Sequence, residues 1–456
     1  MSLSDATIEE VDQAVACAYA CFQHFRKSSG DHRANFLRQI KEELKGEKET
    51  ILGIADHETA LGKKRLSMEF ERTLGEIENF SKLFKEHDLF QANLDPTDSR
   101  GKEHIQMIPL GPVAVIGACN FPLAISVVGT DTISAFVAGC PVIVKSHPGH
   151  PQTCQVLADA VYRAIAHSDM PPHCFQLLHG QKKEVTQHLV RHSGISAIAF
   201  TGSLTGGSAL HAINQERTEP VPFYAEMGSL NPVFALPHAV ESGGRELAKD
   251  YVQAVNLFAG QMCTKPGALF ILQSSITEDF LKALHEAIQG QATLRMLNAE
   301  IHGTYEASCL RLEKQIELFC SSSKETKKEK GRIKIFKMEG NTFLQNKSLR
   351  AEAFGPCSML VSVKDENQFL EIAESLDGSL TASLHGTRKD HRLAERIFPI
   401  LESKTGRLLY NGFPPGVVPG IATHHGGPWP GTTDSRFTSI GKQGYQRFLR
   451  PLIRQN

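Results

Sequence analysis

Gly139-Cys140-Pro141-Val142-Ile143-Val144-Lys145 is the stretch that decides the fold, because it has the pattern of a short buried strand that ends in a charged residue. Similar apolar runs occur at residues 113–116, 175–178 and 197–200, and segments with the pattern of helices lie between them. Strands that alternate with helices predict a parallel sheet covered on both faces. The fold class is therefore predicted to be α/β.

Three residues follow the ends of these predicted strands directly: Asn120, Lys145 and Gly202. The carboxyl ends of parallel strands meet at one edge of a sheet, which is where ligands bind in this architecture. Asn120 also has a simpler interpretation as a turn former before Phe121-Pro122. Lys145 is either a surface cap of its strand or a ligand for a hydroxyl or phosphate group.

The turn after residues 197–200 contains Gly202, Ser203 and Gly207 and opens a predicted helix. Glycines at such a turn allow backbone N–H groups to approach a phosphate. The turn does not have the G-x-G-x-x-G pattern, so the usual dinucleotide fingerprint is absent. By itself this turn is compatible with dinucleotide binding and with an ordinary strand-to-helix connection.

Cys263 lies in a second distinctive stretch, Gly260-Gln261-Met262-Cys263-Thr264-Lys265-Pro266-Gly267. A predicted helix precedes this polar turn, and a buried strand at 268–272 follows it. A cysteine at such a junction can be a nucleophile, because nearby backbone N–H groups stabilise a thiolate and an oxyanion. It can equally be a small buried apolar residue, as most free cysteines are.

The composition of the 456-residue chain is that of a soluble globular protein of two or three domains, with 41% hydrophobic and 22% charged residues. The net charge of −1 gives no basic excess, which argues against nucleic acid and anionic membranes as partners. The most apolar stretch, 121–144, contains Asp131 and two prolines, so no membrane span is predicted. Ten cysteines show no CxxC pair and no metal-ligand spacing, so we expect no metal site. The start of the chain has no secretion pattern, and reduced thiols in the cytoplasm are expected.

Six ordered motifs together resemble those of the aldehyde dehydrogenase superfamily over nearly the whole chain. Chief among them are the strand with Lys145, the Asn120-Phe121-Pro122 turn, Glu226-Met227-Gly228, the Cys263 turn and Glu352-Ala353-Phe354-Gly355-Pro356. The chain resembles most closely the 2-oxoglutarate semialdehyde (2,5-dioxopentanoate) dehydrogenases and the related NADP-dependent fatty aldehyde dehydrogenases. Motifs that carry this finer resemblance include Ser146-His147-Pro148, Ser229-Leu230-Asn231-Pro232 and His425-Gly426-Gly427-Pro428. Met262 and Lys265, beside the cysteine, depart from the family pattern.

The resemblance implies a Rossmann-type cofactor domain, an α/β catalytic domain and a small β arm for oligomerisation. Amphipathic helices are predicted for most of residues 1–96, where Thr7 begins a capping box, and a further helix is predicted at 123–138. The expected dinucleotide-binding domain comprises residues 1–96 and 111–236, the catalytic domain residues 237–430, and the bridging arm residues 97–110 and 431–456.

The resemblance also implies catalytic roles for three residues. Cys263 would attack the aldehyde carbon as a thiolate, and the Asn120 side chain and the Cys263 N–H would stabilise the oxyanion. Glu226 would activate water to hydrolyse the resulting thioester. The simpler alternative for Glu226 is a buried ion-pair partner. Branches of the family that transfer the acyl group to coenzyme A lack this carboxylate, so its presence favours release of a free acid.

The same resemblance places the cofactor. Lys145 would hold the adenosine ribose, Glu352 the nicotinamide ribose, and Phe354 would pack against that position. Branches that prefer NAD have a glutamate where this chain has Pro148, so NADP or NAD is expected, with NADP slightly favoured. The complete set of expected cofactor-binding residues is Lys145, Ser146, Pro148, Gly202, Ser203, Gly207, Glu352 and Phe354.

The predicted function is oxidation of an aldehyde to a carboxylic acid with NAD(P), and 2,5-dioxopentanoate is the preferred substrate. Arg436 is a candidate ligand for the substrate carboxylate by residue type alone. A broad or long-chain fatty aldehyde dehydrogenase remains an alternative, as do a catalytically silent binding protein and a thiol-dependent esterase. A homodimer or homotetramer is expected, in which the arm adds a strand to a neighbouring sheet.

Overall fold

The computed structural model describes residues 3–86, 103–322, 329–414, 416, 420 and 422–455. The chain divides into two compact units, and each is described by itself. The first unit comprises Met1–Glu226, Pro419–His424 and Phe437–Asn456. The second comprises Met227–Val418 and His425–Arg436. The boundary predicted at residue 236 was therefore placed too late, because residues 232–235 form a strand of the second unit's sheet.

A five-stranded parallel sheet forms the centre of the first unit, with the strand order β4-β3-β2-β5-β6. Every residue of β2, β3 and β5 is buried, which explains the continuous apolar runs in the sequence. The strands are β2 (Val113–Ile116), β3 (Val142–Lys145), β4 (Phe175–Leu178), β5 (Ala197–Thr201) and β6 (Phe223–Glu226).

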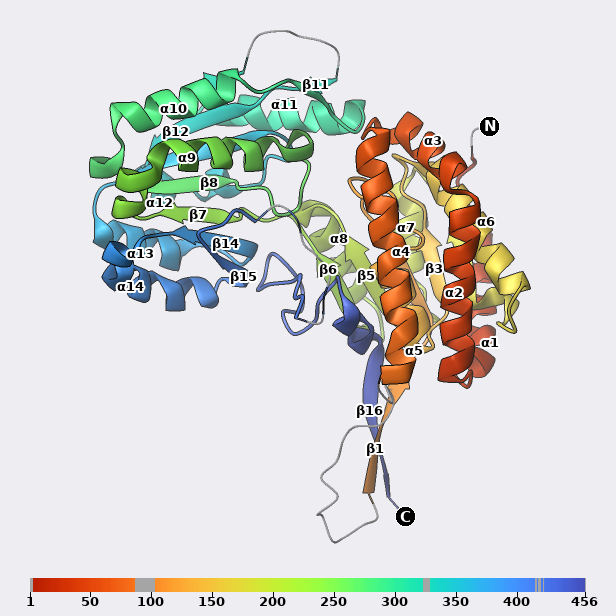
Figure 1. Ribbon diagram of the computed structural model, residues 1–456. Coiled ribbons are helices and arrows are strands. Elements are labelled where there is room, and N and C mark those ends of the chain that lie inside the picture. Colours follow the sequence, from red (N-terminus) through yellow and green to blue (C-terminus); the bar gives the residue numbers. More distant parts are fainter. Residues whose placement is uncertain are drawn as a thin grey trace. The chain divides into compact units, whose positions relative to one another are not determined.

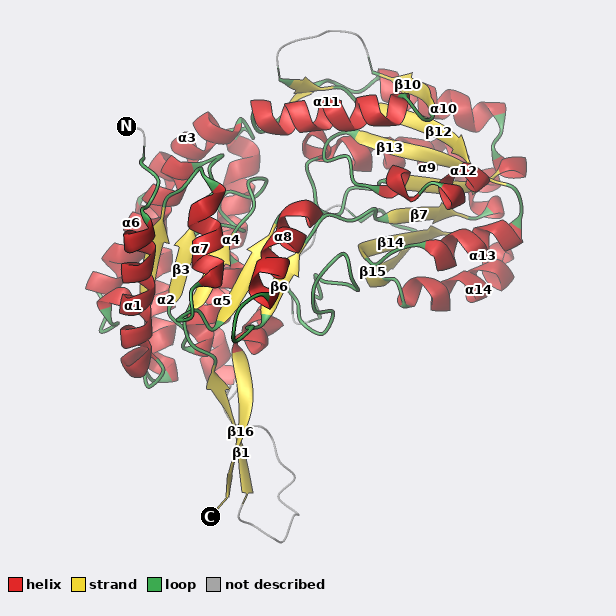
Figure 2. Cartoon of the chain, turned by 180° about the vertical axis from the view of Figure 1, so that it is seen from behind, coloured by secondary structure: helices red, strands yellow, loops and turns green. Residues whose placement is uncertain are grey.

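Helices cover both faces of this sheet. Figure 1 shows α2 and α4 in front of the strands, and Figure 2 shows α7 and α8 in front of them from the opposite side. The helices are α1 (Ile8–Phe25), α2 (Gly30–Gly46), α3 (Lys48–Thr59), α4 (Lys63–Glu86), α5 (Thr130–Ala138), α6 (Pro151–Ala166), α7 (Lys183–Arg191) and α8 (Leu204–Gln215). The predicted capping box is present at the start of α1, where Thr7 and Glu10 exchange backbone-to-side-chain hydrogen bonds of 2.8 and 3.2 Å.

The helix predicted at 123–138 begins only at Thr130. The preceding segment is a turn, because the Glu69 carboxylate accepts hydrogen bonds from the backbone N–H groups of Leu123, at 2.8 Å, and Ala124, at 3.0 Å. Gly129 is the extended residue that caps α5. An apolar sequence pattern cannot reveal that the helix starts late, since the acceptor that binds these N–H groups lies 54 residues earlier in the chain.

The second unit is built on a seven-stranded sheet of order β10-β12-β13-β8-β7-β14-β15, in which only β10 runs antiparallel to its neighbour. Two separate hydrophobic clusters lie on its faces: α9 and α10 contribute to one, and α11 to α14 to the other. The strands are β7 (Pro232–Ala235), β8 (Ala268–Leu272), β10 (Glu317–Ser321), β12 (Lys334–Glu339), β13 (Cys357–Val363), β14 (Ser379–His385) and β15 (Thr405–Tyr410). The helices are α9 (Pro237–Asn256), α10 (Glu278–Gln289), α11 (Ala299–Glu313), α12 (Gly340–Gln345), α13 (Glu366–Ser375) and α14 (His391–Glu402).

Two smaller strand pairs complete the described chain. Strands β1 (Glu103–Pro109) and β16 (Leu449–Gln455) form an antiparallel ribbon that projects from the first unit (Figure 1). Strands β9 (Leu294–Arg295) and β11 (Lys330–Gly331) form the other pair. Residues 97–102 of the predicted arm lie outside the described residues. Among the helices that are described, none combines the length and the apolar character that crossing a membrane requires.

Candidate active site

The carboxyl ends of four adjacent strands bring the candidate residues of the first unit to one edge of its sheet. Lys145 ends β3 beside Ile116 of β2, and Thr201 of β5 pairs with Glu226 of β6. The strand order reverses direction at β2 and β5, which is the switch point where open α/β sheets bind ligands. Gly202 follows β5 directly, and Asn120 lies in the turn beyond the end of β2, so the prediction that these residues share an edge is correct.

Two charged residues of α4 hold the turn that contains Asn120. Arg65 donates to the Asn120 carbonyl oxygen at 2.6 Å, and it lies 3.5 Å from the Glu69 carboxylate, which accepts from the N–H groups of Leu123 and Ala124 later in the turn. Both side chains are buried. Sequence analysis gave the N-terminal helices no part in the site, and it missed this support because Arg65 and Asn120 lie 55 residues apart.

Glu226 is buried and accepts a hydrogen bond from the Ser439 hydroxyl at 2.5 Å. Both residues line a cavity of about 10 Å³, together with the side chains of Ser126, Asp131 and Thr201. This volume corresponds to one water molecule, and the lining supplies several polar partners. The carboxylate is therefore positioned beside a site for water, and no lysine or arginine is among the residues that line this cavity.

A second cavity, of about 130 Å³, lies beyond the ends of β3 and β4. Ser146 and Pro148, two of the expected cofactor-binding residues, line this cavity, and Ser146 Oγ lies 3.0 Å from Nδ1 of His179, which also lines it. Lys145 is buried beside Ser146, and burial lowers the pKa of its ammonium group.

On the other side of the switch point, Ser203 caps α8 by accepting from the Gly206 N–H at 3.1 Å. Gly207 is buried in the first turn of this helix.

The Cys263 turn of the second unit is held in an unusual backbone conformation. Phe258, Ala259 and Gly260 all have positive φ angles, of 52°, 57° and 65°. At Gly260 a Cβ would lie 2.3 Å from the backbone of Gly355, so no other residue fits there. The strain in these residues indicates that the rest of the unit determines the position of Cys263.

Asn231 fixes this turn through hydrogen bonds from its side chain to the backbone. Its Nδ2 donates to the carbonyl oxygens of Cys263, at 2.8 Å, and Lys265, at 3.1 Å. Its Oδ1 accepts from the hydroxyl groups of Ser229, at 2.8 Å, and Thr381, at 2.9 Å. Asn231 is completely buried, and its bonds to Lys265, Ser229 and Thr381 are buried as well, whereas the bond to the Cys263 carbonyl oxygen is partly buried.

Lys265 is the second anchor of the turn. It is 3% exposed, and its Nζ donates to the Cys357 carbonyl oxygen at 2.6 Å. Burial lowers the pKa of this ammonium group and raises the pKa of the Glu352 carboxyl to about 7, although the positive charge of Lys265 opposes the latter shift. A Cβ at Gly228 would lie 1.8 Å from Glu352 Oε2, so this glycine leaves the space that the carboxyl group occupies. Phe354 is half-buried two residues further on.

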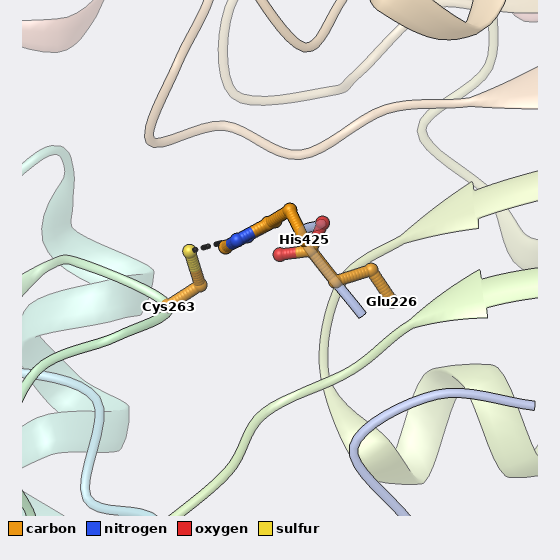
Figure 3. A group of neighbouring side chains, drawn as sticks. All are labelled: Glu226, Cys263 and His425. Atoms are coloured by element: carbon orange, nitrogen blue, oxygen red, sulfur yellow. Dashed lines mark hydrogen bonds between the residues drawn. The ribbon is translucent and has the colours of Figure 1, made fainter. Parts of the chain in front are cut away.

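His425 is the principal residue that sequence analysis did not assign. Its imidazole points at the thiol of Cys263, and the distance from Nε2 to Sγ is 3.4 Å (Figure 3). His425 is 3% exposed, whereas Cys263 is partly accessible. A neutral imidazole in this position can accept the thiol proton, which is how cysteine nucleophiles are commonly activated. The His425-Gly426-Gly427-Pro428 motif was the available signal, but nothing in it indicates contact with Cys263.

The model of the aldehyde dehydrogenase family matches residues 1–445. The chain belongs to the aldehyde dehydrogenase family. Alpha-ketoglutaric semialdehyde dehydrogenase of Acinetobacter baylyi is 37% identical over 99% of this chain and 88% of its own length. Alpha-ketoglutaric semialdehyde dehydrogenase 2 of Azospirillum brasilense is 35% identical over 98% and 87%. The predicted family and the predicted resemblance to semialdehyde dehydrogenases are thus confirmed.

Solved structures give the same fold at lower sequence identity. A 1-pyrroline-5-carboxylate dehydrogenase from Thermus with bound NAD superimposes with a TM-score of 0.84 and 20% identity, over 99% of this chain and 86% of that one. An aldehyde dehydrogenase from Bartonella henselae gives a TM-score of 0.82 at 19% identity, over 99% and 92%. The predicted aldehyde dehydrogenase fold is confirmed.

Members of this family are oxidoreductases that act on aldehydes with NAD or NADP. The residues present fit a dinucleotide: the first unit has a cavity lined in part by Ser146, next to Lys145, and the second has a carboxyl group for which Gly228 leaves space. Glu352 is suited to accept hydrogen bonds from ribose hydroxyls once it is ionised.

Asn231→Asp is expected to reduce both stability and turnover. The aspartate keeps the acceptor for Ser229 and Thr381 but loses both donations to the Cys263 turn. Two buried carbonyl groups without donors would lower the free energy of unfolding by about 2–4 kcal/mol. Denaturant unfolding and the rate at which iodoacetamide alkylates Cys263 measure the two effects. Thr381→Val is the matched control, because it removes one bond to the same side chain and leaves the turn untouched. An alkylation rate equal to that of the wild type would contradict this role of Asn231.

Proposed function

We propose that this aldehyde dehydrogenase oxidises 2,5-dioxopentanoate to 2-oxoglutarate by covalent catalysis at Cys263. The observation that carries the proposal is the 3.4 Å contact between Cys263 Sγ and His425 Nε2, which pairs a nucleophile with a base. The names of the two relatives at 35% and 37% identity support the choice of substrate.

The reaction begins when His425 takes the thiol proton and the Cys263 thiolate attacks the aldehyde carbon. The Asn120 amide and the Cys263 N–H stabilise the oxyanion of the thiohemiacetal, and a donor of this kind contributes about 3–4 kcal/mol. A bound NAD or NADP would supply the hydride acceptor that converts this adduct to a thioester, and Cys263 Sγ would hold the acyl group for hydrolysis.

Hydrolysis completes the cycle. Glu226 removes a proton from the attacking water, the C–S bond breaks, and the acid leaves while the thiol is restored. The hydroxyl group of Ser439 fixes one oxygen of this carboxylate, and the adjoining cavity has room for one water. This arrangement supports hydrolysis, rather than transfer of the acyl group to another thiol.

Arg407 supports an acidic substrate. Burial lowers the pKa of its guanidinium, and the negative charge of a Cys263 thiolate would act in the opposite direction. Its two terminal nitrogens bind the carbonyl oxygens of Pro414 and Gly416, while its buried Nε has no partner among the described residues. Arg436, the candidate suggested by the sequence, is exposed and is bonded to Asp434 at 2.6 Å. We therefore assign recognition of the substrate carboxylate to Arg407.

A substrate panel tests this assignment. We expect kcat/KM to be at least about tenfold higher for 2,5-dioxopentanoate than for succinic semialdehyde, glutaraldehyde or decanal, since a charge-assisted hydrogen bond contributes about 1.5–3 kcal/mol. Arg407→Met should raise the KM for 2,5-dioxopentanoate about tenfold or more and leave that for glutaraldehyde nearly unchanged. Arg436→Met is the control and should behave as the wild type.

Other outcomes of the same panel identify the alternatives. A preference for decanal would favour the fatty aldehyde dehydrogenase. Ester hydrolysis without formation of NADH or NADPH would favour the esterase. An inert wild type, equal to Cys263→Ala on every aldehyde, would favour the silent binding protein.

The cofactor preference, assembly and location remain part of the proposal. NADP is accepted and slightly favoured, because Pro148 has no charge to repel a 2′-phosphate. The protein is a homodimer or homotetramer in which the ribbon of β1 and β16 adds to a neighbouring sheet, as an unpaired strand edge permits. It works in the cytoplasm, and the ten cysteines, none of which forms a disulfide, agree with that location.

A further inference from the structure

The N-terminal segment forms one wall of the cavity beside Ser146. This segment is tied to the loop after β4 by a hydrogen bond of 2.8 Å from the Ala6 N–H to the His179 carbonyl oxygen. Asp5 therefore lies in the wall of the cavity that Ser146 and Pro148 also line, and these two residues are expected to be near the adenosine ribose. The cavity of about 130 Å³ is lined in part by Leu3, Asp5, Ser146, Pro148, His179 and Gln181.

The Asp5 carboxylate has a fixed position and a stable charge. One oxygen accepts from the Gln181 N–H at 2.7 Å, and the other from the Lys182 N–H at 3.3 Å. The bond from Gln181 lowers the pKa of Asp5, and the positive charges of Lys182 and Lys145 act in the same direction. Asp5 is consequently ionised at neutral pH. Its carboxylate also occupies the N–H groups of Gln181 and Lys182, so these two donors do not serve an anionic ligand.

The remaining polar groups of the wall add no positive charge. His179 lies between Ser146 Oγ, at 3.0 Å, and Gln155 Oε1, at 2.8 Å, and burial lowers the pKa of its imidazole. It is neutral at neutral pH. Pro148 is uncharged and exposed. Asp5 is thus the one carboxylate among the residues that line the cavity. Glu58 lies behind this lining, where it accepts from the Gln152 N–H at 2.9 Å, and Lys145 and the exposed Lys182 provide positive charge nearby.

We propose that Asp5 determines how well this enzyme discriminates against a 2′-phosphate on the adenosine ribose. The proposal rests on the proposed function in one respect, namely that Lys145 and Ser146 bind this ribose. A 2′-phosphate carries about −1.5 to −2 charges at neutral pH, so a carboxylate that lines the same cavity repels it. Pro148 stands where NAD-preferring branches of the family have a glutamate, so one carboxylate is missing from the pocket. Asp5 supplies another carboxylate from a different part of the chain, and this keeps the preference for NADP small.

Binding of two nucleotides to the full-length protein tests the proposal without any aldehyde. Isothermal titration calorimetry would compare 2′,5′-ADP, which has the 2′-phosphate, with 5′-AMP, which lacks it. We expect Asp5→Asn to tighten 2′,5′-ADP about tenfold or more and to change 5′-AMP less than twofold, because a single removed charge acts on the 2′-phosphate alone. The ratio of kcat/KM for NADP to that for NAD should rise by a similar factor.

Two further variants make the test specific. Asp5→Glu keeps the charge and should preserve the wild-type ratio of the two affinities. Asp31→Asn makes the same change of charge on an exposed residue of α2 that does not line the cavity, and it should also leave the ratio unchanged. A thermal unfolding midpoint equal to that of the wild type verifies that Asp5→Asn is folded.

The outcomes separate this inference from the proposed cofactor site. If Asp5→Asn alters both nucleotides equally, or neither, the role of Asp5 is wrong while the cofactor site stands. If the wild type binds neither nucleotide, the assignment of the adenosine site is wrong, and the role of Asp5 fails with it.

Discussion

Glu226→Gln is expected to produce one equivalent of NADH or NADPH per active site in a rapid burst and then to turn over about 10²–10⁴ times more slowly than the wild type. The amide has the shape of the carboxylate and can still accept the hydrogen bond from Ser439 that is 2.5 Å long in the wild type. It cannot accept the proton of the attacking water. Acylation of Cys263 therefore proceeds, and the thioester accumulates.

Stopped-flow absorbance at 340 nm measures the burst, and mass spectrometry of the quenched protein detects the acyl group on Cys263. Cys263→Ala is the control that should show neither signal. Ser439→Ala should show an intermediate behaviour, with a burst and a smaller loss of steady-state rate, because the carboxylate remains but is less fixed. A Glu226→Gln protein that turns over at the wild-type rate would remove Glu226 from the mechanism.

The first unit was largely predictable because its elements follow from local sequence. The strands at 113–116 and 175–178 have the predicted bounds, since parallel strands are short apolar runs between helices. The segment at 123–129 was not predictable, because Glu69 of a distant helix binds its N–H groups. The boundary after Glu226 was also missed, since an apolar strand such as β7 does not indicate to which sheet it belongs.

The candidate site likewise contains residues that local sequence reveals and residues that only long-range contacts reveal. Residues in recognisable local motifs, such as Asn120, Glu226 and Cys263, were found from the sequence, although their roles await the experiments described above. The groups that support them were missed, because each acts across a long stretch of chain: 162 residues separate His425 from Cys263, and 213 separate Ser439 from Glu226. A sequence pattern reports periodicity and turns, whereas these contacts exist only once the chain has folded.

His425→Gln is expected to slow acylation about 10²–10⁴-fold at pH 7, since the glutamine amide cannot accept the thiol proton at 3.4 Å from Sγ. Without a base beside it, Cys263 depends on its own ionisation, and a free cysteine has a pKa of about 8.5. The rate of the variant should therefore increase about tenfold for each pH unit between 6 and 8, in proportion to the thiolate fraction. The pH dependence of kcat/KM and of Cys263 alkylation by iodoacetamide measures this effect.

This pH profile separates a base from a residue that only shapes the pocket. A purely structural His425 would lower the rate of the variant by the same factor at every pH, whereas a base is replaced by hydroxide as the pH rises. His424→Gln is the matched control, since it removes an adjacent, less buried imidazole, and it should keep the wild-type profile. Parallel profiles for His425→Gln and the wild type would exclude His425 as the base. In that case the backbone N–H groups of the turn would stabilise the thiolate, and Asn231 and Lys265 would act by fixing this turn.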